Sequence, residues 1–466
     1  MDAAQKEFHD YQRGFGNENS PTWRDLAARD SQIIPSTLLE ESSPNLGSAK
    51  IPPARYISYD YHRQEVDKVW KRTWQVVCRE EEIPKRGDHF VYDVAGLSFL
   101  VVRSGENEFK AFWNVCLHRG RKLVDESGCG AEGFRCAYHA WAWDLNGRLA
   151  YYPGKWDFPD VEAKNFGLRE ALVDCWGGFI FINPDLSAQP FRNHLGSMAQ
   201  HFKDWPLERR HTLWHVQKRV NANWKVAIEA FLESYHVVQT HPQALSSVAE
   251  HGTQYDIWDE GDAAFSRLIT PTAVPSAHAR NGTPLGAISD VWALLNGLRM
   301  DEAATLPDGI RDRASLAQWR RENLQEITAA DYHSLPDTML LDSIQYWLFP
   351  NFCPWLGEGL PLVYQFRPDT DSPDTCFMDV WMLVRSPDDA AAPPAPEMIR
   401  LGPDDAFEPH IGAMGEIFDQ DDVNMPKVQE GLKTWPGDPD GCTLARYQES
   451  RVRFLHQILT KRLATP

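Results

Sequence analysis

Long apolar runs are missing from this chain. Its 466 residues contain no stretch of about eighteen consecutive apolar residues, so we expect no membrane-spanning helix. The opening residues 1–14 are polar and mixed in charge, without the apolar centre of a signal peptide. We therefore expect a cytoplasmic protein that has no membrane partner.

Cysteine and positive charge are also scarce. Eight cysteines are too few for a disulfide scaffold in a chain of this length. The 47 basic residues are outnumbered by 66 acidic ones, and the net charge of −19 argues against nucleic acid as a partner. Hydrophobic residues make up 42% and aromatic residues 12%, which predicts a packed globular protein of more than one domain. Six cysteines are expected to be ordinary reduced thiols: Cys78, Cys129, Cys175, Cys353, Cys376 and Cys442.

The other two cysteines belong to a pair of short motifs. Cys116-Leu-His118 is followed, after seventeen residues, by Cys136-Ala-Tyr-His139. Four such ligands can hold zinc, although zinc sites more often separate the first pair by two to four residues. The pattern favours a Rieske [2Fe–2S] centre, in which Cys116 and Cys136 bind one iron and His118 and His139 bind the other.

A second group of candidate ligands follows about a hundred residues later. A helix over 224–238 would place Glu229, Glu233 and His236 on one face. His241 precedes a proline, which disfavours helical geometry, so the chain can unwind there and bring His241 back beside His236. Two imidazoles and one carboxylate form the facial triad of mononuclear Fe(II) oxygenases.

The carboxylate of this triad has to come from a distant part of the chain. The acidic run Asp419-Gln420-Asp421-Asp422 supplies the candidates. On a helix, adjacent side chains point about 100° apart, so Asp421 and Asp422 cannot both face one metal ion. The run is also typical of an ordinary helix N-terminus, where acidic side chains are favourable. The residues themselves leave the choice open.

Together, the two ligand patterns resemble the large (alpha) subunit of Rieske non-haem iron ring-hydroxylating oxygenases, over about residues 55–460. The resemblance implies an α+β fold: a small all-β Rieske [2Fe-2S] domain and a helix-grip (START/Bet v1-like) catalytic domain with a curved antiparallel sheet. We divide the chain into an N-terminal arm (1–54), the Rieske domain (55–185) and the catalytic domain (186–466). The family's late Asp-Asp pattern favours Asp422 as the third iron ligand.

The resemblance also assigns a role to Glu233. Most family members carry aspartate three residues before the first iron histidine, where this chain has glutamate. In the family, that acid links an iron-bound histidine to a Rieske histidine of a neighbouring subunit, which here implies His236 and the partner subunit's His139. Glutamate at this place resembles the branch that acts on carnitine and related quaternary ammonium compounds.

The implied activity is that of a terminal oxygenase using O₂ at a mononuclear Fe(II). No Gly-x-Gly-x-x-Gly opens a helix after a strand, so NAD(P)H is expected to act indirectly, through a separate flavin-containing reductase, with a ferredoxin as a further candidate. The family assembles as a homotrimer, with or without a beta subunit. We expect hydroxylation of an apolar, aromatic substrate. The alternative is oxidative cleavage or demethylation of a quaternary ammonium, methoxy or N-methyl compound.

Two surfaces around these sites can be anticipated. Arg119, Arg121 and Lys122 flank the first ligand pair and are candidates to dock an acidic electron donor, although a solvated loop explains them equally well. The candidate substrate-pocket residues are aromatic, and such residues are more often part of the core: Phe231, Trp292, Trp347, Phe349 and Phe352.

Overall fold

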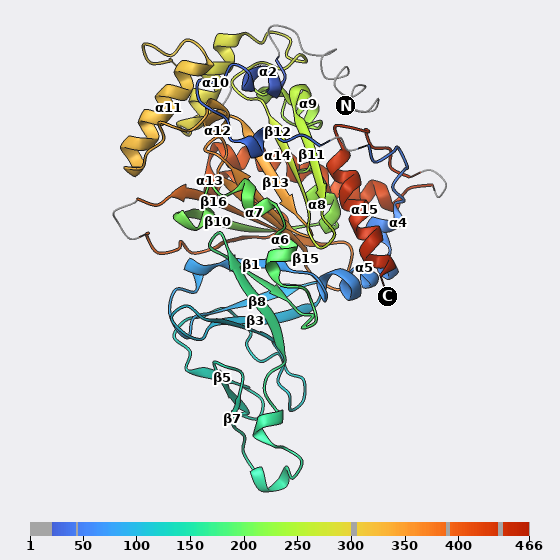
Figure 1. Cartoon of the computed structure of the whole chain (residues 1–466). Coiled ribbons are helices and arrows are strands. Elements are labelled where there is room, and N and C mark those ends of the chain that lie inside the picture. Colours follow the sequence, from blue (N-terminus) through green and yellow to red (C-terminus); the bar gives the residue numbers. More distant parts are fainter. Residues whose placement is uncertain (1–20, 43–44, 300–304, 388–391, 437–440, 466) are drawn as a thin grey trace.

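The computed structural model describes residues 21–42, 45–299, 305–387, 392–436 and 441–465. Within them the chain forms three sheets, arranged as a smaller β part below a larger part of mixed helices and sheet (Figure 1). This is the α+β architecture that was predicted. The expected boundaries at residues 54 and 185 stay predictions.

The smaller part consists of two antiparallel sheets. Its six-stranded sheet has the order β1-β9-β8-β4-β3-β2, and its three-stranded sheet has the order β5-β6-β7. The sequence pattern predicts strands near residues 90–92, 97–102 and 109–115 and a hairpin that turns at Asn146-Gly147. The structure confirms them. The strands are β1 (Gln75–Arg79), β2 (His89–Val94), β3 (Leu97–Arg103), β4 (Phe109–Trp113), β5 (Gly133–Arg135), β6 (Ala142–Asp144), β7 (Leu149–Tyr151), β8 (Glu170–Trp176) and β9 (Phe179–Asn183).

The larger part is built on one eight-stranded sheet of order β11-β12-β13-β14-β15-β16-β10-β17. All neighbours are antiparallel except β10 and β17. The sequence pattern predicts strands at 212–220, 346–349, 362–367 and 377–384, and all four are found here. The strands are β10 (Arg210–Val220), β11 (Gln254–Asp259), β12 (Ala264–Thr270), β13 (Ser343–Leu348), β14 (Phe352–Leu356), β15 (Leu362–Pro368), β16 (Cys376–Arg385) and β17 (Ile399–Leu401).

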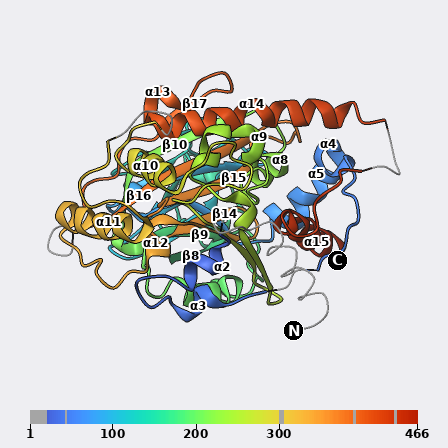
Figure 2. The same cartoon turned by 90° about the horizontal axis from the view of Figure 1, so that it is seen from above.

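Helices surround this sheet, and the long helix α14 runs along one side of it (Figure 2). The stripe of Leu444, Val452, Leu455 and Leu459 predicts a last helix over about residues 443–463. The observed helix begins later, at Ser450. The helices are α2 (Trp23–Ala27), α3 (Ser36–Leu39), α4 (Ala54–Ile57), α5 (Tyr59–Glu65), α6 (Phe191–Leu195), α7 (Met198–His201), α8 (Trp224–Glu229), α9 (Val237–Thr240), α10 (Pro284–Leu295), α11 (Arg313–Thr328), α12 (Asp337–Leu341), α13 (Glu408–Ile411), α14 (Ala413–Lys433) and α15 (Ser450–Ala464). No helix in the described segments is long and apolar enough to cross a membrane.

Buried polar contacts tie the two parts together. Glu81, just after β1, accepts hydrogen bonds from the backbone and hydroxyl of Thr212 on β10. His215 lies between Glu82 and Asp379, with 3.1 Å from each ring nitrogen to a carboxylate oxygen. Burial alone would lower the pKa of His215, but the two carboxylates outweigh it and raise the pKa. The orientation of the small β part is therefore set by directional bonds as well as by apolar packing.

The described part of the N-terminal arm packs on the same chain. Trp23 is fully buried, and its indole nitrogen donates to Thr338 at 2.7 Å. Asp30 accepts backbone hydrogen bonds of 2.9 Å from Asp337 and Thr338 at the start of α12. Residues 1–20 of the predicted arm lie outside the described residues. The segment 386–396, rich in Pro, Ala and Asp, predicts an exposed loop, and its residues 388–391 also lie outside the described residues. No disulfide links the eight cysteines, all of which lie in the described residues.

Candidate metal centres

The first ligand group lies in two loops of the same construction. One follows β4 and carries Cys116; the other follows β5 and carries Cys136. In each loop, the cysteine carbonyl accepts from the amide four residues on, at 2.9 Å from Gly120 and 3.0 Å from Ala140. The cysteine amide donates to the carbonyl five residues on, at 2.8 Å in both loops. Gly120 and Ala140 have φ values of 76° and 62°, so both turns close through the left-handed region.

These loops surround each cysteine sulfur with donors. The backbone N–H groups two and three residues further on hydrogen-bond to the sulfur in both cases. Burial raises the pKa of the Cys116 thiol, whereas at Cys136 the amide bonds and a bond from Cys116 outweigh burial and lower the pKa. Both residues are 2% exposed. Two shielded sulfurs with aimed N–H groups are suited to an anionic sulfur centre.

The two histidines face each other beside these sulfurs. The ring centroids of His118 and His139 are 4.5 Å apart, and Trp141 stacks on His118 with an interplanar angle of 2°. The Nδ1 atoms of both histidines are buried and have no hydrogen-bond partner in the described structure. Burial, and then the charges of His139 and Arg119, lower the pKa of His118, which favours the neutral imidazole that a metal requires. The four residues therefore fit a [2Fe–2S] cluster.

The second ligand group is built around an interrupted helix. Asn223 stands where the sequence predicts a helix N-cap, and its side chain accepts a hydrogen bond from the Lys225 amide at 3.0 Å. The helix that it caps, α8, ends at Glu229. The predicted continuation to residue 238 is wrong. The amide of Ser234 donates to the Tyr255 hydroxyl and its side chain bonds Thr270, so tertiary hydrogen bonds replace helical ones there.

This break separates residues that were expected on one helix face. Glu229 turns away from the histidines, with Oε1 2.8 Å from His456 Nε2 and Oε2 accepting from the Tyr56 hydroxyl at 3.1 Å. His236 and His241 instead flank α9, a single turn. His241 has φ −123° and ψ 59°, so the predicted departure from helical geometry before the proline is confirmed.

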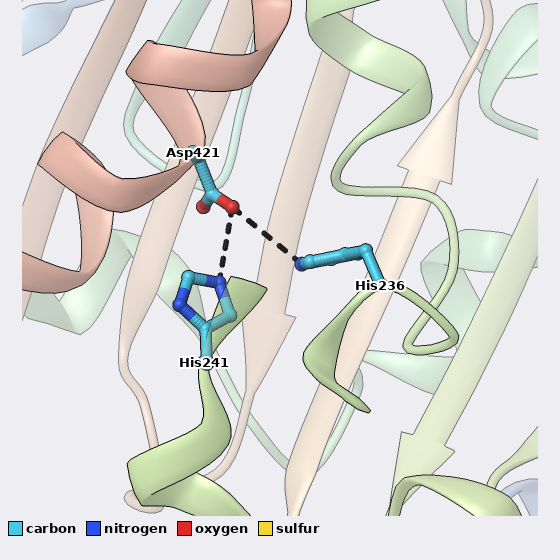
Figure 3. A group of neighbouring side chains, drawn as sticks. All are labelled: His236, His241 and Asp421. Carbon is cyan, nitrogen blue, oxygen red and sulfur yellow. Dashed lines mark ion pairs between the residues drawn. The ribbon is translucent and has the colours of Figure 1, made fainter. Parts of the chain in front are cut away.

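His236, His241 and Asp421 converge on one point (Figure 3). Asp421 Oδ1 lies 3.0 Å from His241 Nε2 and 3.6 Å from His236 Nε2. One ligand atom from each residue lies within 4.8 Å of the others. Two imidazole nitrogens and one carboxylate oxygen form the donor set expected for a mononuclear iron with open positions.

Acceptors behind both imidazoles fix their tautomers. Glu233 Oε1 is 2.7 Å from His236 Nδ1, and Gln420 Oε1 is 2.7 Å from His241 Nδ1. Each Nδ1–H therefore donates away from the site, and each Nε2 presents its lone pair to a metal. Without a metal, burial by itself lowers the pKa of His236, but the charge and hydrogen bond of Glu233, together with Asp421, raise it to about 9.

Asp422 does not join this group. Its Oδ2 lies 3.2 Å from Nζ of Lys218 on β10, whose side chain is only 1% exposed. Adjacent residues of α14 point about 100° apart, so the helix turns Asp422 towards β10 when Asp421 faces the histidines. The expectation of Asp422 as third ligand is therefore corrected: the geometry brings Asp421 to the histidines.

A cavity of about 180 Å³ opens beside His236, His241 and Asp421. Its lining is mostly apolar, and no Lys or Arg is found among the described residues that form it. Glu233 and Asp421 are its carboxylates, and both are engaged by histidines. The aromatic side chains in the lining are Phe231, Trp355, Tyr364 and Phe418.

Of the predicted pocket residues, only Phe231 lines this cavity. Trp347 packs against Phe349 and Phe454, and Phe352 packs against aromatic residues of the six-stranded sheet. Trp292 lies on α10 beside lining residues without joining them. Sequence reasoning missed Trp355 and Tyr364, although the alternation of Leu362 and Tyr364 along β15 is a signal that marks one face of a strand.

Comparison with known proteins settles the family. The model of the ring hydroxylating alpha subunit (catalytic domain) matches residues 198–465, more than half of the chain. The chain belongs to this family. A second model, the Rieske [2Fe-2S] domain, matches residues 73–162. The predicted family, its fold class and its pair of cofactors, a Rieske [2Fe–2S] cluster and a mononuclear iron, are thereby confirmed.

Individual relatives point to different substrates. The chain is 32% identical to the biphenyl 2,3-dioxygenase alpha subunit of Rhodococcus jostii (strain RHA1) over 222 residues, 46% of this chain and 48% of that protein. It is 28% identical to the glycine betaine monooxygenase oxygenase subunit of Pseudomonas aeruginosa (strain UCBPP-PA14) over 241 residues, 50% of this chain and 56% of that protein. The chain thus spans about half the length of these curated relatives.

The fold also resembles solved structures. A quaternary ammonium Rieske monooxygenase in complex with L-carnitine superposes with a TM-score of 0.62, covering 91% of this chain and 99% of the other. The sequence identity is 17%, so the likeness concerns the fold alone.

Proposed function

We propose that this protein is the terminal oxygenase subunit of a multicomponent enzyme that hydroxylates an apolar, aromatic substrate with O₂. One observation carries the proposal: His236, His241 and Asp421 converge at the wall of an apolar cavity in a chain that also contains a Rieske ligand set. When bound, the cluster passes single electrons and the ferrous iron activates O₂ at its open positions.

The residues around the site orient the ligands and exclude water. Glu233 and Gln420 hold the two imidazoles, and the apolar lining keeps the substrate's reacting carbon in a dry space next to the three ligands. Monohydroxylation consumes one O₂, two electrons and two protons and releases one water. Dihydroxylation has the same requirements and leaves both oxygen atoms on the substrate. In either case, two electrons come from outside the chain.

We infer that these electrons arrive from another copy of the chain, within a homotrimer. The sheet β5-β6-β7, next to the Rieske loops, lies at the end of the molecule far from α9 and α14 (Figure 1). A second hollow of about 220 Å³ also reaches Glu233, His236 and Asp421, and Glu229 and Glu449 line it. This acidic hollow suits the Rieske tip of a partner, and Glu233 is the proposed link between His236 and the partner subunit's His139.

The electron source in this proposal is a separate flavin-containing reductase that uses NAD(P)H, with or without a ferredoxin. Exposed basic groups near the first ligand loop suit such a partner. Arg121 is paired with Asp125 at 2.8 Å and Lys122 with Asp93 at 2.9 Å, whereas Arg119 stacks over the exposed ring of Tyr138. Of the three basic residues, Arg119 is the one that the structure does not hold in an ion pair.

The cavity lining supports an apolar substrate over a zwitterionic one. A betaine carries a carboxylate, which needs a cationic or multiply donating partner when it is buried. No Lys or Arg lines the cavity in the described segments, and most of its surface is aliphatic or aromatic. Apolar burial is therefore the main source of binding free energy that the site offers.

Iron content and product labelling test the proposal. The intact oxygenase should hold about three irons per chain, two in the cluster and one at the triad, whereas a Rieske electron carrier would hold about two. Supplied with a surrogate reductase, NADH and ¹⁸O₂, it should convert at least one of a panel of aromatic compounds to a product carrying ¹⁸O. His236→Ala should abolish the product, and His410→Ala, which changes an exposed histidine on α13, should not.

Two outcomes would reject this proposal. Full turnover by His236→Ala would remove the triad from the chemistry. Labelled product from L-carnitine, with none from a panel of aromatic compounds, would move the assignment to quaternary ammonium cleavage.

A further inference from the structure

Gln345 occupies a special position on the cavity wall. It lies on β13, where it pairs in register with Leu268 of β12 and Trp355 of β14, and all three side chains line the cavity. The residue is only 1% exposed. It is therefore a buried polar side chain placed in the middle of a mostly apolar wall.

A buried arginine fixes the orientation of the Gln345 amide. Arg451 of α15 is fully buried, and its Nη1 donates to Gln345 Oε1 at 2.9 Å. Since guanidinium groups only donate, the oxygen of the amide must face Arg451, and the Nε2 group must be the opposite end. Nε2 makes no hydrogen bond to any described residue, which leaves two N–H donors available at the cavity wall.

The charge of Arg451 strengthens this donor. Its other hydrogen bonds go to Ser266 Oγ at 2.9 Å and to the Leu232 carbonyl at 3.3 Å, and no carboxylate pairs with it among the described residues. Its Nη2 is buried and has no hydrogen-bond partner among the described residues. A cation behind the amide oxygen polarises the amide, so the N–H groups become better donors to a ligand. The same positive charge disfavours a cationic ligand group at this wall.

We propose that Gln345 is a specificity-determining residue that donates a hydrogen bond to an acceptor oxygen of the substrate, with Arg451 as its positioning residue. This inference rests on the proposed function and narrows its substrate class. The substrate is an apolar molecule that carries one uncharged acceptor oxygen, such as a ketone, an ether or a phenol. Anchoring that oxygen fixes which carbon lies beside His236, His241 and Asp421.

The experiment compares two ligands that differ by one acceptor. Indane and 1-indanone share a bicyclic carbon frame, and the ketone replaces one CH₂ group. Calorimetric titration of the iron-loaded protein, without O₂ or reductase, gives the ratio of the Kd for indane to the Kd for 1-indanone. Because a neutral hydrogen bond contributes about 0.5–1.5 kcal/mol, losing it should lower this ratio roughly 2–13-fold.

Two substitutions separate the donor from the fold. Gln345→Leu removes the amide. Gln345→Glu keeps the shape and the bond to Arg451 but presents a carboxylate oxygen instead of an N–H group, so it should fold and lose the ketone preference. Gln318→Leu, the same substitution at an exposed residue of α11 that does not line the cavity, is the matched control and should keep the ratio.

The results discriminate clearly. A roughly 2–13-fold lower ratio in both Gln345 variants, with the control unchanged, supports the proposal. A ratio within twofold of the native value in the folded Gln345→Glu protein overturns it. Because binding is measured without turnover, a failure of the oxygenase assignment would appear in the labelling experiment and not in this ratio.

Discussion

Neighbouring aspartates of α14 should differ sharply when each is changed to asparagine. Asp421→Asn removes the anionic ligand of the proposed triad. Its carboxylate oxygen lies 3.0 Å from Nε2 of His241 and 3.6 Å from Nε2 of His236. Asp422→Asn removes the carboxylate that lies 3.2 Å from the buried Lys218 ammonium. The two variants have the same change in charge and composition, so each serves as the control of the other.

The expected magnitudes follow from these contacts. Asp421→Asn should lower the iron content from about three to about two per chain, because the triad loses its charged ligand while the Rieske cluster is untouched. Asp422→Asn should keep the iron. It should cost about 1.5–3 kcal/mol of folding free energy, the range for a hydrogen bond to a charged group. Lys218 keeps backbone carbonyl partners at Gly402 and Pro403, so the loss is smaller than for an isolated buried charge.

Iron per chain, measured by metal analysis after anaerobic reconstitution, is the decisive assay. The electron paramagnetic resonance signal of the reduced cluster counts the Rieske centre separately, and thermal melting reports stability. For a domain as large as the catalytic one, this loss of folding free energy in Asp422→Asn corresponds to a Tm that is lower by roughly 3–12 °C. If Asp422→Asn loses the mononuclear iron and Asp421→Asn retains it, the geometric assignment is refuted.

Three further predictions concern the surroundings of the two centres. Glu233→Gln should reduce turnover roughly 10–100-fold while most iron is retained, since the amide is a weaker acceptor for His236 Nδ1; turnover within twofold of native would exclude the role of Glu233. Arg119→Glu should raise the KM for the reductase and make it less sensitive to salt, with substrate binding unchanged, as steady-state kinetics at two ionic strengths would reveal. In the metal-free protein, the pKa of His236 is raised to about 9, so the stability that it contributes is fully present below about pH 6.5 and is lost as the pH rises through 9. Denaturant titrations should show this loss, at most about 3 kcal/mol, in native protein and not in His236→Gln.

Local sequence was sufficient to predict which residues lie together in the proposed Rieske ligand set and that the two proposed iron histidines lie side by side. Short fixed spacings brought Cys116 and His118, or Cys136 and His139, into one loop each, and the proline after His241 marked the end of the helix. Strand patterns likewise predicted four of the eight strands of the larger sheet, β10, β13, β15 and β16. These features depend on residues within a few positions of one another, where backbone geometry leaves few alternatives.

The errors arose where distant contacts decide the outcome. The helix expected through Glu233 stops at Glu229, because Ser234 forms hydrogen bonds with Tyr255 on β11 and Thr270 on β12. The choice between the two aspartates depended on the rotation of α14. That rotation is set by partners far away in the sequence, so spacing alone could not predict it.

The cavity wall was the least predictable part. Its residues come from several strands and helices, and most of them are apolar or aromatic in a way that fits an ordinary core. Gln345 is polar within a strand, but its importance depends on Arg451, which lies more than a hundred residues further along the chain. Only the assembled sheet shows that this amide has one free end.

Four successive side chains of α14, at residues 419–422, form a tetrad that fixes the rotation of the helix about its own axis. Asp419 accepts from the backbone amides that open α13, and Gln420 holds His241. Asp421 lies with His236 and His241 in the proposed metal triad, and Asp422 forms an ion pair with Lys218 on β10. Inserting or deleting a single residue just before this tetrad would turn all four contacts by about 100° at once. Insertions and deletions are therefore expected to be tolerated in the loops on either side of α14 but not within residues 419–422.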